Sequence, residues 1–126
     1  MGAKKILIVD DEAQMRRVLR TTLRAHECEV VEAASGEEAL RRLNEEPCDV
    51  ILLDLNLPGL DGIDTCRAIR STSQVPIVVV SVRDSESDKA AARQAGADDY
   101  ITKPFGIEEL LSRIQAVSAG KPGSSS

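Results

Sequence analysis

The stretch Asp49-Val50-Ile51-Leu52-Leu53-Asp54 places four consecutive aliphatic residues directly before a carboxylate. An apolar run without polar alternation is typical of a strand that is buried on both faces, as in a parallel sheet. A charge at the end of such a strand is costly unless it has partners. The stretch therefore predicts a buried parallel strand over 49–53 and a polar site at Asp54.

Apolar strands alternate with amphipathic helices on both sides of this stretch. The other predicted strands cover 5–9, 28–32, 77–80 and 99–102, and the predicted helices cover 12–25, a segment after Ser35, 61–71, 84–95 and 106–118. Ser35 and Glu38 have the spacing of a capping box, and Gly96 is suited to end the fourth helix. Five β-α units predict an α/β fold of the flavodoxin-like (βα)5 type, with a doubly wound five-stranded parallel sheet in the order 2-1-3-4-5.

Helical spacing assigns an apolar face to the first and last helices. The predicted buried positions are Met15, Val18, Leu19, Thr22 and Leu23 in the first helix, and Ile107, Leu110, Leu111, Ile114 and Val117 in the last. The fourth helix is rich in Ala and has few large side chains, so it is expected to be among the least firmly packed elements.

Composition indicates a single domain with an aliphatic core that does not bind nucleic acid directly. The 126 residues fit one domain, predicted over 1–119, and residues 120–126 have the composition of a linker or an added tail. With only Tyr100 and Phe105 as aromatic residues, the core must be aliphatic. The net charge of −5 argues against direct nucleic-acid binding by this chain.

The sequence also favours a cytoplasmic location. No apolar run approaches the roughly 20 residues of a membrane span, and no signal-peptide pattern is present, so neither a membrane nor a secretory role is expected. Three cysteines, Cys28, Cys48 and Cys66, form no CxxC pair. They are expected to be reduced, as in a cytosolic protein.

Polar side chains follow four of the five predicted strands: Asp10 and Asp11 after the first, Asp54 after the third, Ser81 at the fourth and Lys103 at the fifth. Each acid alone fits a solvated turn, but the carboxyl ends of parallel strands share one edge of the sheet, so the group should gather there. Clustered carboxylates need a cation, and oxygen ligands select a hard ion such as Mg²⁺. Asp54 as nucleophile, with Lys103 and Ser81 contacting phosphoryl oxygens, would suit phosphoryl transfer.

Four segments resemble the receiver domain of two-component response regulators: VDDE at 9–12, LDLNLPGLDG at 53–62, SVR at 81–83 and GADDYITKPF at 96–105. The resemblance covers residues 4–118. It implies that Asp54 accepts a phosphoryl group from a sensor histidine kinase in a Mg²⁺-dependent reaction. It also implies a signalling module whose only catalysis is its own phosphorylation and autodephosphorylation.

The resemblance further assigns the roles of individual residues around Asp54. It implies that Asp10, Asp11, Asp54 and the backbone carbonyl of Asn56 hold the metal ion, with Asp11 ligating directly and Asp10 mainly through water. It implies that Lys103 binds the phosphate and that its bond to the following proline is cis.

The resemblance also implies a pair of switch residues. Ser81 would move toward the phosphate, and Tyr100 would then turn inward. One position departs from the family pattern, because Val82 stands where Ala or Gly is usual. Val82 would either screen the phosphate and crowd Tyr100 or simply extend an apolar strand.

Charges on the fourth and fifth helices resemble those of OmpR/PhoB-type regulators, in which they form a symmetric dimer face. The residues concerned are Lys89, Arg93, Asp98, Asp99, Glu109 and Arg113. The resemblance implies a homodimer that forms on phosphorylation and controls a DNA-binding output domain absent from this chain. Residues 85–89 and 103–107 are most similar to potassium-responsive members of that subfamily.

Other functions stay open at this point. One is a stand-alone receiver without an output domain. Another is a small Mg²⁺-dependent aspartate phosphohydrolase, although Asn56 stands where the haloacid-dehalogenase type has a second Asp. A nucleotide-binding domain is disfavoured because the chain has neither GxGxxG nor GxxxxGK[ST].

Overall fold

A computed structural model describes residues 3–119 of the chain, so the predicted tail at 120–126 lies outside the described residues. Five strands alternate with five helices over this range. In chain order the elements are β1 (Lys5–Val9), α1 (Ala13–Ala25), β2 (Glu29–Ala33), α2 (Gly36–Glu45), β3 (Val50–Leu53), α3 (Gly62–Arg70), β4 (Ile77–Ser81), α4 (Glu86–Ala95), β5 (Asp99–Thr102) and α5 (Ile107–Ala119).

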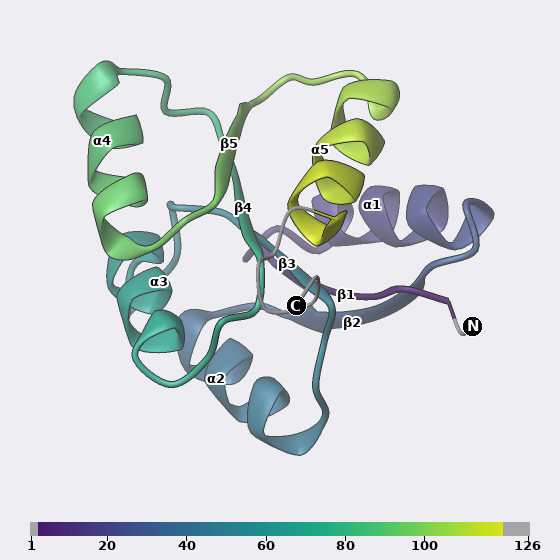
Figure 1. Ribbon diagram of the computed structural model, residues 1–126, viewed down its shortest axis with the longest axis horizontal. Helices are drawn as coiled ribbons and strands as arrows, with labels where there is room; N and C mark the ends of the chain where they lie inside the picture. Colours follow the sequence, from purple (N-terminus) through teal and green to yellow (C-terminus); the bar gives the residue numbers. More distant parts are fainter. Residues whose placement is uncertain (1–2, 120–126) are drawn as a thin grey trace.

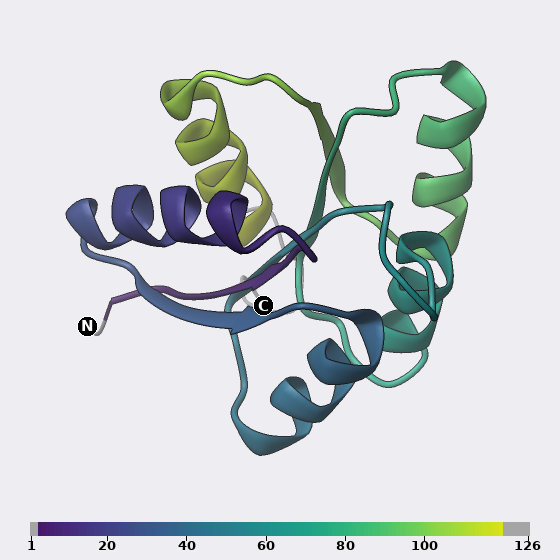
Figure 2. The same cartoon turned by 180° about the vertical axis from the view of Figure 1, so that it is seen from behind.

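All five strands are parallel and lie in the order β2-β1-β3-β4-β5, which confirms the predicted topology. Helices α1 and α5 cover one face of the sheet, and α2, α3 and α4 cover the other (Figure 1, Figure 2). The chain reverses its direction of winding between β1 and β3. Ligands of such sheets bind at this point, beyond the carboxyl ends of the strands.

The central strands β1, β3 and β4 are almost wholly apolar because alternate residues enter two separate cores. Ile8 and Leu52 pack with Leu23 of α1 and Leu110 of α5, whereas residues of the opposite parity pack against α2 and α3. All four residues of β3 are buried. The central strands therefore lack the polar alternation of a sheet with one wet face.

Two helix ends follow the sequence signals. The Ser35 hydroxyl accepts the Glu38 N–H at 3.1 Å, and the Glu38 carboxylate accepts the N–H of Ala34, one residue earlier than in the usual capping box. Gly96 ends α4 with φ +114°, a conformation that favours glycine. The Lys103–Pro104 bond is cis, as the family resemblance implied.

The predicted buried face of α1 is wrong at Val18, which is 54% exposed. Leu19 and Leu23 carry the packing on the sheet, and Val18 lies at the edge of the apolar stripe. Ile107 of α5 is similarly 36% exposed. The strand predicted over 28–32 also begins one residue later, at Glu29.

None of the helices within residues 3–119 has the length and hydropathy to cross a membrane.

Candidate functional site

The carboxyl ends of β1 and β3 bring three acidic residues together. Oxygen atoms of the Asp10, Asp11 and Asp54 carboxylates all lie within 4.8 Å of one another. Asp10 and Asp54 are only 3% and 6% exposed, whereas Asp11 faces solvent. The strand register explains this convergence, because Val9 pairs with Leu53 and the residue after each strand is an aspartate. The structure thus brings together the three carboxylates that the sequence singled out.

Lys103 reaches this cluster from the end of β5. Its Nζ atom donates to Asp10 Oδ2 at 3.0 Å and to Asp54 Oδ2 at 3.2 Å. Burial disfavours the charged ammonium, but hydrogen bonds and negative charge from Asp10 and Asp54 outweigh it and raise the pKa of Lys103. The lysine is therefore a fixed cation between two carboxylates.

Asp54 is held in place by its own loop. The Asn56 N–H donates to Asp54 Oδ1 at 3.1 Å, and the Asp54 N–H donates to the Val9 carbonyl at 2.9 Å. Burial raises the pKa of Asp54, and the Asn56 N–H and the Lys103 ammonium oppose part of that rise. Each carboxylate oxygen of Asp54 thus accepts a hydrogen bond, Oδ1 from the Asn56 N–H and Oδ2 from the Lys103 ammonium.

The donor set fits a hard divalent cation. Three carboxylates with one ammonium leave an excess of negative charge, and every candidate ligand atom is an oxygen. Oxygen-rich, acidic sites with few protein ligands are typical of Mg²⁺, which retains part of its water shell. No histidine or cysteine belongs to the cluster, which argues against a zinc-type centre.

Arg16 supports Asp10, and the sequence patterns did not single it out. Its Nη1 atom donates to the Asp10 carbonyl at 2.7 Å, and its Nε atom pairs with Glu32 at 3.1 Å. The Glu12 N–H donates to Asp10 Oδ1 at 2.9 Å. Arg16 lies in the first turn of α1, and only the packing of α1 beside β2 shows which groups it contacts.

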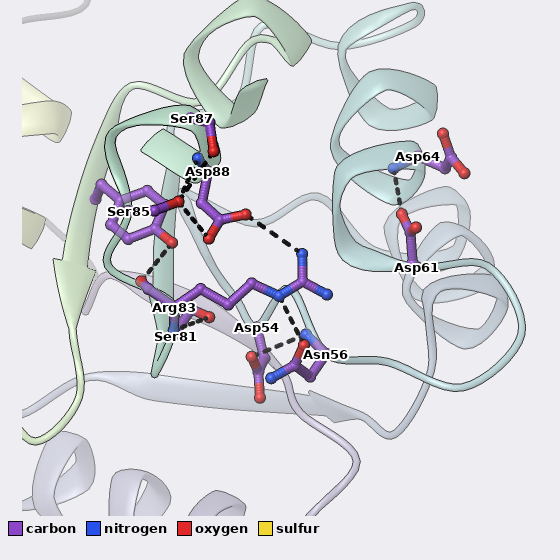
Figure 3. Close-up of polar contacts among 10 residues, drawn as sticks. Asp54, Asn56, Asp61, Asp64, Ser81, Arg83, Ser85, Ser87 and Asp88 are labelled. Atoms are coloured by element: carbon purple, nitrogen blue, oxygen red, sulfur yellow. Dashed lines mark hydrogen bonds and ion pairs between the residues drawn. The ribbon is translucent and has the colours of Figure 1, made fainter. Parts of the chain in front are cut away.

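The two predicted switch residues are joined through the main chain of Arg83. The buried Ser81 hydroxyl accepts the Arg83 N–H at 3.1 Å (Figure 3). The half-buried Tyr100 hydroxyl donates to the Arg83 carbonyl at 2.7 Å. Burial raises the pKa of Tyr100, so the phenol keeps its proton for this bond. Arg83 was quoted in a sequence motif, but its contacts were not predicted.

Val82 does not extend a strand, because β4 ends at Ser81 and Val82 is 60% exposed. It lines an apolar groove of about 590 Å³ with Val18 and Ile107, which are the other exposed large hydrophobic residues of the described chain. Lys103 and Phe105 also line this groove, so it adjoins the acidic cluster.

The six residues of the predicted dimer face lie on α4, β5, α5 and the turn before β5. Five of them, Lys89, Arg93, Asp98, Asp99 and Arg113, line a polar pocket of about 250 Å³ together with Tyr100. Several of their charges are paired within the chain. Arg113 binds Asp99 at 2.7 Å and approaches Glu109 at 3.9 Å, and Asp98 binds Arg70 at 2.9 Å.

Comparison with known proteins gives a family and several relatives. The family model described as the response regulator receiver domain matches residues 6–115. Transcriptional regulatory protein KdpE of Mycobacterium tuberculosis is 46% identical over 111 residues, which cover 88% of this chain and 49% of KdpE. The chain therefore spans about half the length of this curated relative.

Solved structures give the same result. The BeF3-activated N-terminal receiver domain of Klebsiella pneumoniae RstA is 33% identical with a TM-score of 0.88, covering 91% of this chain and 98% of that one. The receiver domain of the sensor histidine kinase PA1611 from Pseudomonas aeruginosa is 32% identical with a TM-score of 0.87, covering 94% of this chain and 100% of that one. Magnesium is coordinated in the active-site cleft of the PA1611 domain.

Proposed function

We propose that this chain, which belongs to the family of response regulator receiver domains, accepts a phosphoryl group on Asp54 from a sensor histidine kinase. The environment of Asp54 carries the proposal. Its carboxylate is 6% exposed, accepts a hydrogen bond from Lys103 and lies beside two further carboxylates. The domain is a cytoplasmic signalling module that turns over no external substrate beyond its phosphoryl donor.

Four groups would hold the metal ion that this reaction needs: the carboxylates of Asp10, Asp11 and Asp54 and the backbone carbonyl of Asn56. When bound, Mg²⁺ supplies positive charge next to the phosphoryl oxygens and lowers the repulsion between an anionic donor and the acidic site. The magnesium in the PA1611 domain supports this choice of ion.

The transfer itself is a displacement at phosphorus. One Asp54 oxygen forms a new O–P bond while the N–P bond of the donor phosphohistidine breaks, and the leaving imidazole keeps that electron pair and takes up a proton. Lys103 exchanges its bond to Asp54 Oδ2 for one to a phosphoryl oxygen. The Ser81 hydroxyl already accepts the Arg83 N–H, so its own proton is available for a second phosphoryl oxygen.

The apolar groove beside Lys103 provides a docking face for the donor. A phosphohistidine on a kinase helix has to approach Asp54 from the loop side of the sheet. Val18, Val82 and Ile107 are exposed there and line one groove, which suits the apolar face of a helix. Val82 would then contact the donor and screen the phosphorylated site from water.

Phosphorylation changes the α4–β5–α5 face through movement of the switch residues, Ser81 and Tyr100. When Ser81 moves toward the phosphate, Tyr100 gives up its bond to the Arg83 carbonyl and turns inward, which changes the α4–β5–α5 face. Dimerisation then requires Asp99 and Arg113 to exchange partners within the chain for partners in a second copy. As in a KdpE-type transcriptional regulator, the dimer would control a DNA-binding domain that lies outside this chain, and a stand-alone receiver is the alternative.

Acetyl phosphate with Mg²⁺, followed by intact mass measurement, tests the acceptor. We expect one phosphoryl adduct on the parent chain and none on Asp54→Asn. Asp64→Asn is the control, because Asp64 is an exposed acid on α3 and its loss should leave the adduct unchanged. Steady hydrolysis of a generic phosphomonoester without any adduct would instead indicate a phosphohydrolase and overturn the proposal.

A further inference from the structure

Arg83 contacts both switch residues with its main chain and two other segments of the site with its side chain. Its main chain bonds to Ser81 and Tyr100, the two switch residues. Its guanidinium extends in another direction, toward Asn56 and Asp88 (Figure 3). There Nε donates to Asn56 Oδ1 at 2.9 Å, and Nη1 lies 3.8 Å from Asp88 Oδ1.

The two side-chain partners of Arg83 belong to different elements. Asn56 lies in the loop between β3 and α3, and its own N–H donates to the Asp54 carboxylate at 3.1 Å. One end of the guanidinium therefore holds the loop that positions the phosphoryl acceptor.

Asp88 is fixed from the other side by the cap of α4. The Ser85 hydroxyl accepts the Asp88 N–H at 3.0 Å and lies 2.8 Å from Asp88 Oδ2. Since Oδ2 faces the cap, Oδ1 is left to face Arg83. The second end of the guanidinium therefore holds the first turn of α4.

We propose that Arg83 is a positioning residue that acts through Asn56 and ties the acceptor loop to the first turn of α4. The residues drawn in Figure 3 contain a continuous chain of contacts from Asp54 through Asn56 and Arg83 to Asp88. This inference rests on the proposed function for its consequence, which is that a change at Asp54 also reaches α4 through the side chain of Arg83, in addition to the main-chain bonds of Arg83 to Ser81 and Tyr100.

The residue type matters because two nitrogen atoms are used at once. A guanidinium is planar and offers several donors in a fixed arrangement, so Nε and Nη1 can serve two partners. An ammonium group carries all of its donors on one nitrogen atom, so it lacks the two separate nitrogen positions that face Asn56 and Asp88 here. Arg83→Lys should therefore keep the charge and lose the tie.

The ion pair between Arg83 and Asp88 is weak enough to break and re-form when the domain changes state. The Arg83 and Asp88 side chains are 38% and 31% exposed, and partly exposed ion pairs contribute little to stability. A small local effect, rather than unfolding, is expected when the tie is removed.

Hydrogen exchange of the unphosphorylated, Mg²⁺-free chain tests the tie directly. The Asn56 and Leu57 amides are both hydrogen-bonded, so their exchange reports the state of the loop. We expect Asp88→Asn to speed their exchange about two- to fivefold, the range open to a partly exposed pair. In an Arg83→Ala or Arg83→Lys background the same Asp88→Asn change should have no further effect.

Asp64→Asn is the matched control. Asp64 occupies the same position in the first turn of α3, where its N–H bonds to the capping Asp61 side chain (Figure 3). The ion-pair partner of Asp64 is Arg67. Asp64→Asn should leave the Asn56 and Leu57 amides unchanged in every background. Exchange at first-turn amides of α4 shows independently that Asp88→Asn has acted there.

Two results would overturn the inference. One is faster exchange in α4 with no change at Asn56 and Leu57. The other is an equal effect of Asp88→Asn on these amides with and without Arg83.

Labelling by acetyl phosphate then measures the consequence for the reaction, and we expect Arg83→Ala and Arg83→Lys to be about two- to fivefold slower than the parent. A parental rate in both variants would refute the positioning role. If even the parent chain takes no phosphoryl group, the proposed function fails, and the exchange experiment still decides whether Arg83 ties the loop to α4.

Discussion

Gly62 is the first residue of α3 and lies directly against the end of the strand that carries Asp54. A Cβ atom at this position would lie 2.3 Å from Leu55 Cα and 2.5 Å from the Asp54 carbonyl oxygen. Both are backbone atoms, so no side-chain rotation can relieve the overlap. The Gly62 N–H also donates to the Leu55 carbonyl at 3.0 Å, which holds α3 at this distance. Gly62→Ala must therefore move the backbone next to the acceptor.

The size of the effect follows from these distances. Ordinary van der Waals contact of a Cβ begins at 3.4 Å, so the backbone has to separate by about 1 Å at Leu55. Overpacking of a rigid site costs about 1–3 kcal/mol, and a clash with backbone belongs at the upper end. The gain in helix propensity from Gly to Ala offsets less than about 1 kcal/mol. We expect a net loss of about 2 kcal/mol in the free energy of unfolding.

Urea unfolding followed by circular dichroism measures this loss, and acetyl phosphate labelling measures the functional effect. A misplacement of about 1 Å can slow a reaction by up to about 100-fold, so labelling of Gly62→Ala should be at least about tenfold slower. Gly106→Ala is the control, because a Cβ there meets nothing within 4 Å. The free energy of unfolding of Gly106→Ala should stay within about 0.5 kcal/mol of the parent value, and the variant should be labelled at the parental rate.

If Gly62→Ala unfolds at the parental urea concentration and labels at the parental rate, close approach of α3 to the acceptor strand is not what fixes Asp54. Equal destabilisation by Gly62→Ala and Gly106→Ala would likewise refute the steric reasoning, since only one of the two sites is crowded.

Three further predictions concern other parts of the molecule. Arg70→Met should lower the free energy of unfolding by about 2–3 kcal/mol in urea titrations, because the guanidinium donates to the Gly96 carbonyl and to Asp98, and Arg70→Lys should recover less than half of the loss. A loss below about 0.5 kcal/mol would show that these bonds add nothing. Lys103→Ala should still take up some phosphoryl group, yet the product should stay monomeric by light scattering, and a normal dimer would rule out a switching role for this lysine. Burial raises the pKa of the Cys66 thiol to about 11, so at pH 8 its thiolate is about 100-fold scarcer than that of an ordinary cysteine, and a disulfide reagent should modify it only as the chain unfolds. Rapid modification in the folded chain would contradict the packing of α3.

The topology and the acidic cluster were predictable from the sequence because their signals are local. A run such as Val50–Leu53 is typical of a strand that is covered on both faces, and five strands separated by helices leave few parallel arrangements. Residues that directly follow parallel strands share one edge of the sheet. The positions of Asp10 and Asp54 at that edge are therefore set by chain order alone.

Helix faces were less predictable at their margins. The spacing of Val18 is correct for an apolar stripe, but the stripe is wider than the area of sheet that α1 covers. The exposed remainder lies beside Val82 and Ile107, which belong to two other segments of the chain. Sequence periodicity measures the width of a stripe and cannot show how much of it is covered.

The amino-acid sequence by itself determined the strand order, the acidic cluster at the sheet edge and the lysine that completes it. The tertiary structure alone decided which partners surround them. Arg16 and Arg83 act through bonds to residues that are distant in the chain, and Gly62 matters because a helix approaches a strand closely. Long polar side chains can reach many places along a sequence, and only the packing of the elements selects the acceptor that each of them contacts.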